Sequence, residues 1–378
     1  MIPFNKPYLV GNELLYMHEA VISGKISGNG VFTKKCQTFF EEKYKFKKCL
    51  LTTSCTDALE MAAILCDIQP GDEVIVPSYT FVSSALAFVR QGASIVFTDS
   101  GSNNPNVNVD EIEGLITPRT KVIVPVHYAG VACDMDRIMA IAEKYNLLVV
   151  EDAAQSISSF YKGIPLGRMG HLSCFSFHET KNIISGEGGM LAINDERFIR
   201  RAEMIWEKGT NRNEFFRGEV NKYGWMDVGS SFLPSELNAA FLYAQLENLE
   251  LIQSKRVKIW EKYNNELEYF CKSYGIGVPC IPEYATNNGH MYYLVCKTLE
   301  ERSMLIQYLK NSGILLAFHY QSLHSSPYYV DKYKGYPLPN SDFFANRLVR
   351  LPLFYELTSE EQDKIIHTIK EFYHQYYL

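Results

Sequence analysis

The chain has 378 residues, of which 47% are apolar and 21% charged, and its formal net charge is −6. These proportions are typical of a globular protein and exclude disordered, fibrous and low-complexity chains. The negative net charge excludes the broad basic field that holds nucleic acid, so any phosphate group must be bound locally.

The first nine residues lack the basic and then apolar pattern of a signal peptide, and no later stretch approaches the roughly 20 apolar residues that span a bilayer. The nine cysteines show neither CxxC pairs nor a nearby histidine at zinc-ligand spacing. We therefore expect a soluble cytoplasmic protein with reduced thiols, no metal site, and neither a membrane nor a nucleic-acid partner. Disulfides or a metal site are the less favoured alternative.

Between residue 50 and about residue 195, short runs of β-branched residues alternate with helical segments, which is typical of βαβ units around a largely parallel sheet. The pattern predicts strands at 49–51, 74–77, 94–97, 122–125 and 147–150, and helices at 84–91, 110–116 and 135–145. The predicted fold class is therefore a doubly wound α/β domain and not a β-sandwich.

The spacing of apolar residues differs in the second half of the chain. Residues 198–209 and 235–263 carry apolar residues at helical spacing, and the polar loop 210–231 between them is long enough to favour a functional role. Later segments predict strands at 291–296 and 315–319 and helices at 301–311 and 359–373. A chain of this length has material for two domains, so we expect a large α/β domain at 10–250 and a smaller α+β domain at 251–378.

Asp152 comes directly after the predicted strand 147–150 and Glu151, so it lies at the carboxyl end of a parallel strand, where open α/β sheets bind ligands. An enzyme that uses pyridoxal 5'-phosphate (PLP) needs such a carboxylate against the pyridine nitrogen, because the protonated ring acts as an electron sink. Taken alone, Asp152 fits the N-cap of a following helix more readily.

Lys181 follows a short apolar strand that ends near Ser176, and it precedes the glycine-rich segment 185–189. A lysine amine can form a Schiff base with an aldehyde, be displaced by an amino donor, and carry a proton. A lysine in such a loop is usually a solvated cation, so its neighbours decide the interpretation. Ser176, five residues earlier, places a hydroxyl where it can hold a phosphate.

Three more positions add to this pattern. Residues 53–57 open a helix after the strand 49–51, and helix N-termini with small hydroxyl residues bind anions, although an ordinary cap is an equally good explanation. Phe81 follows another strand and can stack on a flat ring, with a core phenylalanine as the alternative. Gln155 can hydrogen-bond to a ring hydroxyl. The order of these elements, each at a strand end, indicates a PLP site.

At these residues the sequence resembles the DegT/StrS family of sugar-nucleotide aminotransferases, which share the fold-type I PLP architecture. The resemblance covers nearly the whole chain, and its carriers are residues 54–59, 77–81, 151–156, 175–182, 186–189 and 350–354. It implies that Lys181 forms the Schiff base and carries the proton, that Asp152 and Gln155 contact the ring nitrogen and ring hydroxyl, and that Phe81 stacks on the ring. It also implies a phosphate cradle, formed by Ser54, Cys55, Thr56 and Ser176.

The resemblance further implies a homodimer in which both chains complete each active site. Many relatives supply an asparagine from the neighbouring subunit to the phosphate, but Leu233 stands at the aligned position, and Ser230 or Ser231 is the candidate replacement. The loop 210–231 is then expected to serve the opposite site, where nucleotide phosphates need local donors. Its candidate substrate-binding residues are Arg212, Arg217 and Tyr223.

His319, Tyr320 and His324 lie in a segment that resembles the family's substrate mouth, and structural roles for them are equally open. Within the family, residues 177–182, 207–212, 215–218 and 227–231 resemble the transaminases of enterobacterial common antigen synthesis, a polysaccharide pathway. That likeness implies transfer of the amino group of L-glutamate to carbon 4 of TDP-4-keto-6-deoxy-D-glucose, which gives TDP-4-amino-4,6-dideoxy-D-galactose.

Several alternatives stay open. The same chemistry can give the 4-amino-gluco epimer or a 3-amino sugar nucleotide, because small differences in the pocket decide the product. A more distant alternative is a regulatory protein that binds PLP without turnover. Dehydratases of the family carry histidine in place of the lysine, so Lys181 disfavours that activity.

Overall fold

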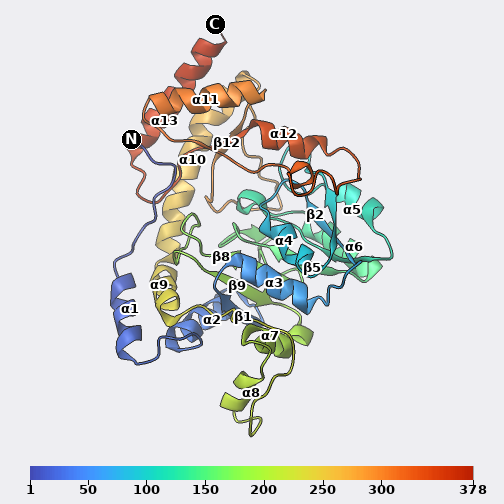
Figure 1. Cartoon of the computed structure of the whole chain (residues 1–378). Helices are drawn as coiled ribbons and strands as arrows, with labels where there is room; N and C mark the ends of the chain where they lie inside the picture. The colour runs from blue at the N-terminus through green and yellow to red at the C-terminus, as the bar shows by residue number, and fades with distance from the viewer. Residues whose placement is uncertain (378) are drawn as a thin grey trace.

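The computed structural model describes residues 1–377, and its centre is a seven-stranded sheet in the order β1-β9-β8-β5-β4-β2-β3 (Figure 1). The strands are β1 (Lys48–Thr52), β2 (Glu73–Pro77), β3 (Ser94–Thr98), β4 (Thr120–Ile123), β5 (Leu148–Asp152), β8 (Leu172–Ser176) and β9 (Gly189–Ile193). The pairs from β8 through β3 are parallel, whereas β9 runs antiparallel to both β8 and β1. The predicted, largely parallel α/β sheet is therefore confirmed, while the antiparallel β9 was not predicted.

Helices cover both faces of this sheet. The large part of the chain contains α1 (Glu13–Ile22), α2 (Val31–Tyr44), α3 (Cys55–Leu65), α4 (Ser83–Val89), α5 (Val109–Leu115), α6 (Met135–Tyr145), α7 (Ile199–Trp206), α8 (Arg212–Phe216) and α9 (Glu236–Glu247). The long helix α10 (Leu249–Ser273) follows, and most of its buried residues pack in the core of the C-terminal part. A small hairpin, β6 (Phe160–Tyr161) with β7 (Ile164–Pro165), and the short 3-10 helices Tyr128–Gly130 and Glu196–Phe198 lie in the connections. In residues 1–377 no helix combines the length and the apolar content needed to cross a lipid bilayer.

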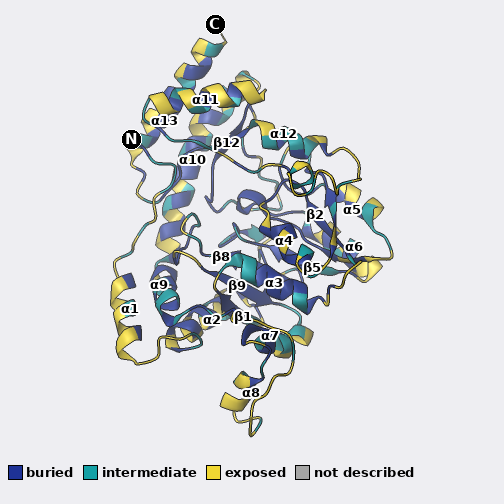
Figure 2. Cartoon of the chain, in the orientation of Figure 1, coloured by how far each residue is buried: buried dark blue, intermediate teal, exposed yellow. Residues whose placement is uncertain are grey.

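The alternation of side-chain direction along each strand explains why helices cover both faces of the sheet. Val74 and Val76 of β2 are buried against α3 and α4, whereas Ile75 between them packs with residues of α5 and α6. Successive side chains of a strand point to opposite faces, so a strand with helices on both sides is apolar throughout. Figure 2 shows the result, with the central strands buried and the outer faces of the helices exposed.

The predicted helix 235–263 is wrong in one respect, because it is two helices. Asn248 ends α9 with φ −109° and ψ 13°, and α10 begins at Leu249 and continues to Ser273. The predicted loop 210–231 contains the short helix α8, which projects from the body of the chain in Figure 1.

A second, three-stranded antiparallel sheet is formed by β10 (Tyr293–Val295), β12 (Leu348–Arg350) and β11 (Ala317–Phe318). It is accompanied by α11 (Leu299–Asn311), the 3-10 helix Leu323–Ser325, α12 (Pro339–Arg347) and α13 (Ser359–Tyr376). A bridge between Ile2 and Ile314 ties the start of the chain to this part. The division at residue 250 remains a prediction, and it falls next to the start of α10.

Candidate active site

A cavity of about 800 Å³ lies at the carboxyl ends of the central strands. Its walls include residues from the connections that follow β1, β2 and β4, together with the last residues of β5 and β8. The opposite wall comes from the C-terminal part and contains His290, His319 and Arg350. Parallel strands that end at one edge bring their following residues together, which is the expected location of a ligand site.

Asp152 is the last residue of β5, and its carboxylate is held from two sides. Oδ2 accepts a hydrogen bond from Ser84 Oγ at 2.6 Å, and Oδ1 accepts one from the Ala154 amide at 3.1 Å. Turns, and no helix, follow the strand, so the N-cap explanation of Asp152 is wrong. The carboxylate is buried yet borders the cavity, where it can accept a hydrogen bond from a ring N–H.

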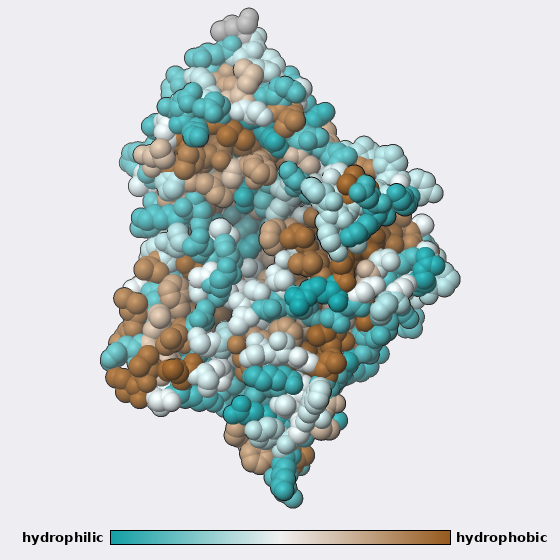
Figure 3. Space-filling model, in the orientation of Figure 1, coloured by the Kyte–Doolittle hydropathy of each residue, from teal (hydrophilic) through white to brown (hydrophobic). Residues whose placement is uncertain are grey.

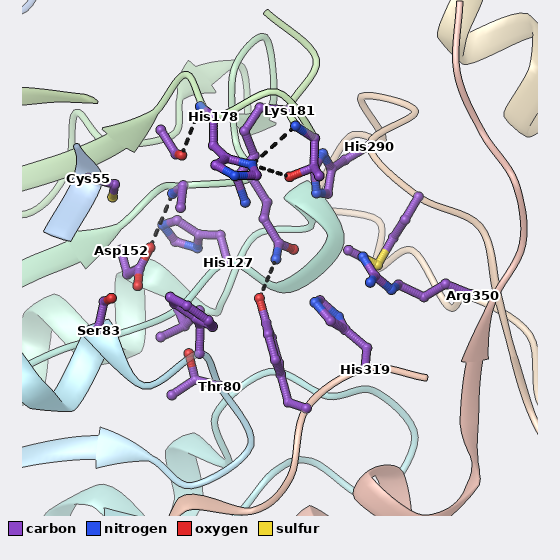
Figure 4. A pocket seen from close by; sticks show the side chains of 18 of the residues that line it. Cys55, Thr80, Ser83, His127, Asp152, His178, Lys181, His290, His319 and Arg350 are labelled. Carbon is purple, nitrogen blue, oxygen red and sulfur yellow. Dashed lines mark hydrogen bonds between the residues drawn. The ribbon is translucent and has the colours of Figure 1, made fainter. Parts of the chain in front are cut away.

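Lys181 lies on a turn after β8, fixed by a 2.8 Å hydrogen bond from its own amide to the His178 carbonyl. Its side chain enters the cavity, as Figure 4 shows. Burial lowers the pKa of the Lys181 amine, and the charge of Arg350 acts in the same direction, while Cys55 and Asp152 oppose the shift. A lowered pKa increases the fraction of neutral amine, which is the nucleophilic form.

The start of α3 forms the floor of the cavity. Ser54 is the N-cap of this helix, because its Oγ accepts a hydrogen bond from the Asp57 amide at 3.1 Å. The cap alternative is thus confirmed for Ser54, and the residue also borders the cavity with Cys55 and Thr56. The first amides of a helix lack intrahelical acceptors, so this wall can hold a phosphate. Ser176, at the end of β8, lines the same cavity.

The remaining cofactor candidates also face the cavity. Phe81 is 55% exposed and lies on the cavity wall, so it is not a core residue. Gln155 accepts a 2.6 Å hydrogen bond from the Ala129 amide through Oε1 and donates one of 3.1 Å from Nε2 to the Tyr320 hydroxyl. The Tyr320 ring lies 6.0 Å from the Phe81 ring, and His319 Nδ1 lies 2.8 Å from the Tyr128 hydroxyl.

Four of the predicted substrate-binding residues do not line this cavity in the same chain. His324 Nδ1 lies 2.7 Å from Ser78 Oγ, and His324 does not border the cavity. Arg212 and Arg217 line a second cavity of about 680 Å³ beside α8, together with Leu233. Tyr223 is half exposed and packs against Phe215 at a ring distance of 5.7 Å. A single chain therefore does not bring these four side chains to Lys181.

The structure adds residues that the sequence did not single out. His127 borders the cavity, and its Nε2 lies 2.8 Å from Glu151, whose carboxylate also accepts hydrogen bonds from the amides of Gly167 and Met169. Ser84 belongs to no motif, since its role depends on a contact across the fold. His290 and Arg350 face the cavity from the C-terminal part, and only Arg350 stood in a segment that resembled the family.

The cavity fits an aromatic aldehyde that carries a phosphate. It offers a buried amine, a buried carboxylate held in place by Ser84, and the start of a helix as an anion site. PLP needs these three groups, so the residues present match the cofactor.

Comparison with known proteins agrees with a PLP site in this cavity. The sequence profile of the DegT/DnrJ/EryC1/StrS aminotransferase family matches residues 7–370. The uncharacterized protein MJ1066 of Methanocaldococcus jannaschii is 32% identical over 350 residues, which is 90% of each chain. The putative sugar aminotransferase Spr1654 from Streptococcus pneumoniae, solved in its PMP form, superposes with a TM-score of 0.92 at 27% identity and covers 99% of this chain and 100% of its own.

Two further structures extend the comparison. Spr1654 in its PLP form gives a TM-score of 0.90 at 27% identity, over 99% of each chain. The aminotransferase TlmJ from Streptoalloteichus hindustanus gives 0.91 at 26% identity over the full length of both chains.

Proposed function

Since the chain belongs to the DegT/DnrJ/EryC1/StrS aminotransferase family and is thus a PLP-dependent transaminase of fold-type I, we propose that it acts on a sugar nucleotide. The proposed reaction transfers the amino group of L-glutamate to carbon 4 of TDP-4-keto-6-deoxy-D-glucose and gives TDP-4-amino-4,6-dideoxy-D-galactose. Support for a sugar substrate comes from Spr1654, described as a putative sugar aminotransferase. Support for carbon 4 comes from the resemblance of residues 177–182 and 207–212 to transaminases with that substrate.

The observation that carries the proposal is the convergence of Lys181 and Asp152 in one cavity, from the ends of neighbouring strands. When bound, PLP supplies an electron sink for the charge that develops as the amino group is transferred. In our proposal Lys181 holds the cofactor covalently and Asp152 binds the ring nitrogen. Phe81 covers the ring, Gln155 binds its hydroxyl, and the start of α3 with Ser176 binds the phosphate.

Lys181 is suited to move protons because its environment favours the neutral amine. Burial lowers its pKa, and the surrounding walls limit the access of water. His290 and His319 lie in the same cavity, and burial together with the charges of Lys181 and Arg350 lowers their pKa values well below the usual range. Both imidazoles are therefore neutral. We assign the proton exchange at the reacting carbon to Lys181, whose neutral amine can accept a proton and return it.

We assign the second cavity to the nucleotide of a neighbouring subunit's substrate. It is lined by more cations than carboxylates: Lys25, Lys34, Lys48, Lys208, Arg212 and Arg217 against Glu41, Glu203 and Glu207. A diphosphate is the kind of group that such a surface binds. Leu233, at the position where relatives supply an asparagine, lines this cavity as well.

Exposed apolar residues support the proposed homodimer. Trp225 is 84% exposed and Phe216 is 65% exposed in the arm around α8, and Leu14 of α1 is 74% exposed. Figure 3 shows apolar side chains gathered over α1 on the visible face of the molecule. Contiguous exposed apolar surface indicates a protein interface. The free state of all nine cysteines favours the reducing cytoplasm as the location of this dimer.

Product analysis tests the proposal. The purified enzyme is incubated with L-glutamate and TDP-4-keto-6-deoxy-D-glucose, and the product configuration is determined by NMR. We expect an axial amine at carbon 4. An equatorial amine indicates the gluco epimer, and an inert ketone overturns the substrate. Turnover of the 3-keto isomer in place of the 4-keto sugar indicates amination at carbon 3. Conversion of the PLP form to the PMP form by glutamate alone excludes the non-catalytic regulatory protein.

A further inference from the structure

Tyr320 lies on the wall of the main cavity, on the turn between β11 and the 3-10 helix that follows it. Its φ angle is 42°, in the left-handed region that a bulky residue keeps only where its surroundings hold it there. Two contacts anchor this turn to the segment after β2. The Tyr79 hydroxyl donates a hydrogen bond to the His319 carbonyl. The Leu323 amide donates one of 2.9 Å to the Ser78 carbonyl. The turn therefore holds the Tyr320 side chain against the cavity.

Gln155 determines the direction of the Tyr320 hydroxyl. Gln155 Oε1 accepts a hydrogen bond from the Ala129 amide at 2.6 Å, so the other terminal atom of the side chain is the amide nitrogen. That nitrogen lies 3.1 Å from the Tyr320 hydroxyl oxygen, which must accept, because an amide nitrogen only donates. Among residues 1–377 no second hydrogen bond engages this hydroxyl, so its own proton is left for a ligand in the cavity.

The same amide connects Tyr320 to the reacting end of the cofactor. Gln155 Nε2 carries two hydrogens, of which one is directed at Tyr320 and the other is available for the ring hydroxyl of PLP. In PLP that ring hydroxyl is on the carbon next to the one that carries the aldehyde. We therefore expect the free proton of Tyr320 to lie on the side of the cofactor where the substrate carbon reacts, in the cavity that Lys181 enters.

The environment of Tyr320 keeps it a donor. Burial raises the pKa of Tyr320, although the charge of Arg350 opposes the shift, so the hydroxyl is protonated at neutral pH. The ring is held between other rings, with centre-to-centre distances of 3.5 Å to His319 and 6.0 Å to Phe81. Phe81 is the residue assigned to cover the cofactor ring, so the fixed Tyr320 hydroxyl borders the same space.

We propose that Tyr320 is a catalytic residue, whose hydroxyl donates a hydrogen bond to the carbonyl oxygen of the reacting ketone. This inference rests on the proposed function, because a transaminase brings a ketone to this end of the cavity. When an amine adds to a ketone, a C–N bond forms, the C=O π bond breaks, and its electron pair moves to the oxygen. The oxygen then leaves as water with the two protons that the amine gives up. A donor that is already in place stabilises the charge on that oxygen, and Tyr320 keeps its own proton.

The first test measures a spectrum and not turnover. The probe is 2-oxoglutarate labelled with carbon-13 at its keto carbon, which binds the PLP form of the holoenzyme without reacting, because this form has no amine to transfer. Difference infrared spectroscopy then reports the hydrogen bonds to the bound keto group. Its stretching frequency should lie at or below the value in water for the unaltered enzyme and should be higher in Tyr320→Phe, where the donor is lost.

Equal frequencies in the two proteins would overturn the inference. A frequency above the aqueous value in the unaltered enzyme would overturn it as well, so the measurement decides even if Tyr320→Phe does not fold. If the unaltered enzyme does not bind 2-oxoglutarate, the proposed donor is wrong, and the same measurement with the labelled keto-sugar decides the role of Tyr320.

The second test separates catalysis from cofactor binding. Tyr320→Phe should lower the single-turnover rate constants of both half-reactions by roughly 100-fold, the usual effect of losing one donor to a developing oxyanion. The KM for the keto-sugar and the affinity of the apoenzyme for PLP should stay within about threefold, because Gln155 remains bound to Ala129. A loss of PLP affinity that accounts for the lost activity would show that Tyr320 merely holds Gln155. Slower transfer to the keto-sugar alone would show a contact with the sugar and contradict the carbonyl role.

Tyr333→Phe is the matched control. Tyr333 also belongs to the C-terminal part, its hydroxyl donates a 2.6 Å hydrogen bond to the Tyr336 carbonyl, and it does not border the cavity. This variant should change neither the infrared frequency nor the rate constants, and the melting temperatures of both variants show whether they fold. A loss of rate in Tyr333→Phe equal to that in Tyr320→Phe would assign the effect to the fold and not to the hydroxyl in the cavity.

Discussion

Ser84 Oγ, at the start of α4, donates a 2.6 Å hydrogen bond to Asp152 Oδ2 at the end of β5. Thr80 Oγ1 lies 2.9 Å from the same Ser84 oxygen, so that oxygen can accept a hydrogen bond from Thr80 while it donates one to the carboxylate. This chain of hydroxyls fixes the orientation of Asp152. In our proposal it keeps one carboxylate oxygen directed at the cofactor ring nitrogen.

The Ser84 contact leads to a first prediction. Ser84→Ala should weaken the affinity of the apoenzyme for PLP by about tenfold, because a hydrogen bond to a buried carboxylate contributes roughly 1–3 kcal/mol. Titration of the apoenzyme with PLP, followed by fluorescence, measures the change. Asp152→Asn should cost most of the activity, whereas Ser303→Ala, on the exposed face of α11, should change neither. Unchanged PLP affinity in Ser84→Ala would show that the contact does not orient Asp152.

The pKa of Lys181 gives a prediction about pH. Because burial lowers this pKa below 10.5, the neutral amine should accumulate at a lower pH than in free lysine. The rate at which PLP attaches covalently to the apoenzyme should rise with pH and reach its plateau below pH 10.5. Stopped-flow absorbance measures this profile.

Lys181→Ala provides the control, since it should abolish both covalent attachment and turnover. Borohydride reduction of the unaltered holoenzyme should label the peptide that contains Lys181 and no other. A label on a different lysine, or a plateau at the pH of free lysine, would contradict this assignment.

Gly189 is predicted to be essential for the anion site. A Cβ at this first residue of β9 would overlap with the backbone of Ser54 and Cys55, where α3 begins. Gly189→Ala should therefore lower the free energy of unfolding by about 1–3 kcal/mol, the usual cost of overpacking, and should also weaken PLP binding. Urea denaturation and PLP titration measure the two effects.

Gly114 is the matched control for that substitution. It lies inside α5, and in residues 1–377 no atom beyond its chain neighbours and the backbone of its own helix lies within 4 Å of the position that a methyl group would take there. Gly114→Ala should raise the free energy of unfolding by up to about 1 kcal/mol, because alanine is the better helix former, and should not affect PLP binding. Similar losses in both variants would rule out the steric explanation.

Shared active sites predict complementation between inactive chains. Lys181→Ala removes the catalytic amine, and Arg212→Ala with Arg217→Ala removes the arm residues that we assign to the opposite site. When the two inactive proteins are mixed and allowed to exchange subunits, half of the dimers should be mixed, and each mixed dimer should contain one intact site. Activity should return to about a quarter of the unaltered level, as expected for a twofold-symmetric dimer. Persistent inactivity after confirmed exchange would place each site within one chain.

The sequence predicted the fold better than it predicted individual contacts. Strands β2 to β5 and helices α4 to α6 match their patterns, because alternation and helical spacing are local signals. The cap at Ser54 is local as well, since it depends on an amide three residues away. The break at Asn248 was not predicted, because apolar spacing continues across it and packing on both sides decides where the helices end.

The sequence by itself determined the largely parallel α/β architecture and the turn that carries Lys181, because each depends on residues close together in the chain. Only the tertiary structure decided that Ser84 orients Asp152 and that Phe81 lies on the open wall of the cavity. It also decided that His324 forms a hydrogen bond with Ser78 and does not border the cavity. It also brought Arg350 of the C-terminal part to the same cavity as Lys181. Spacing along a chain does not encode contacts between residues 68 or 246 positions apart, which arise only when strands and helices pack together.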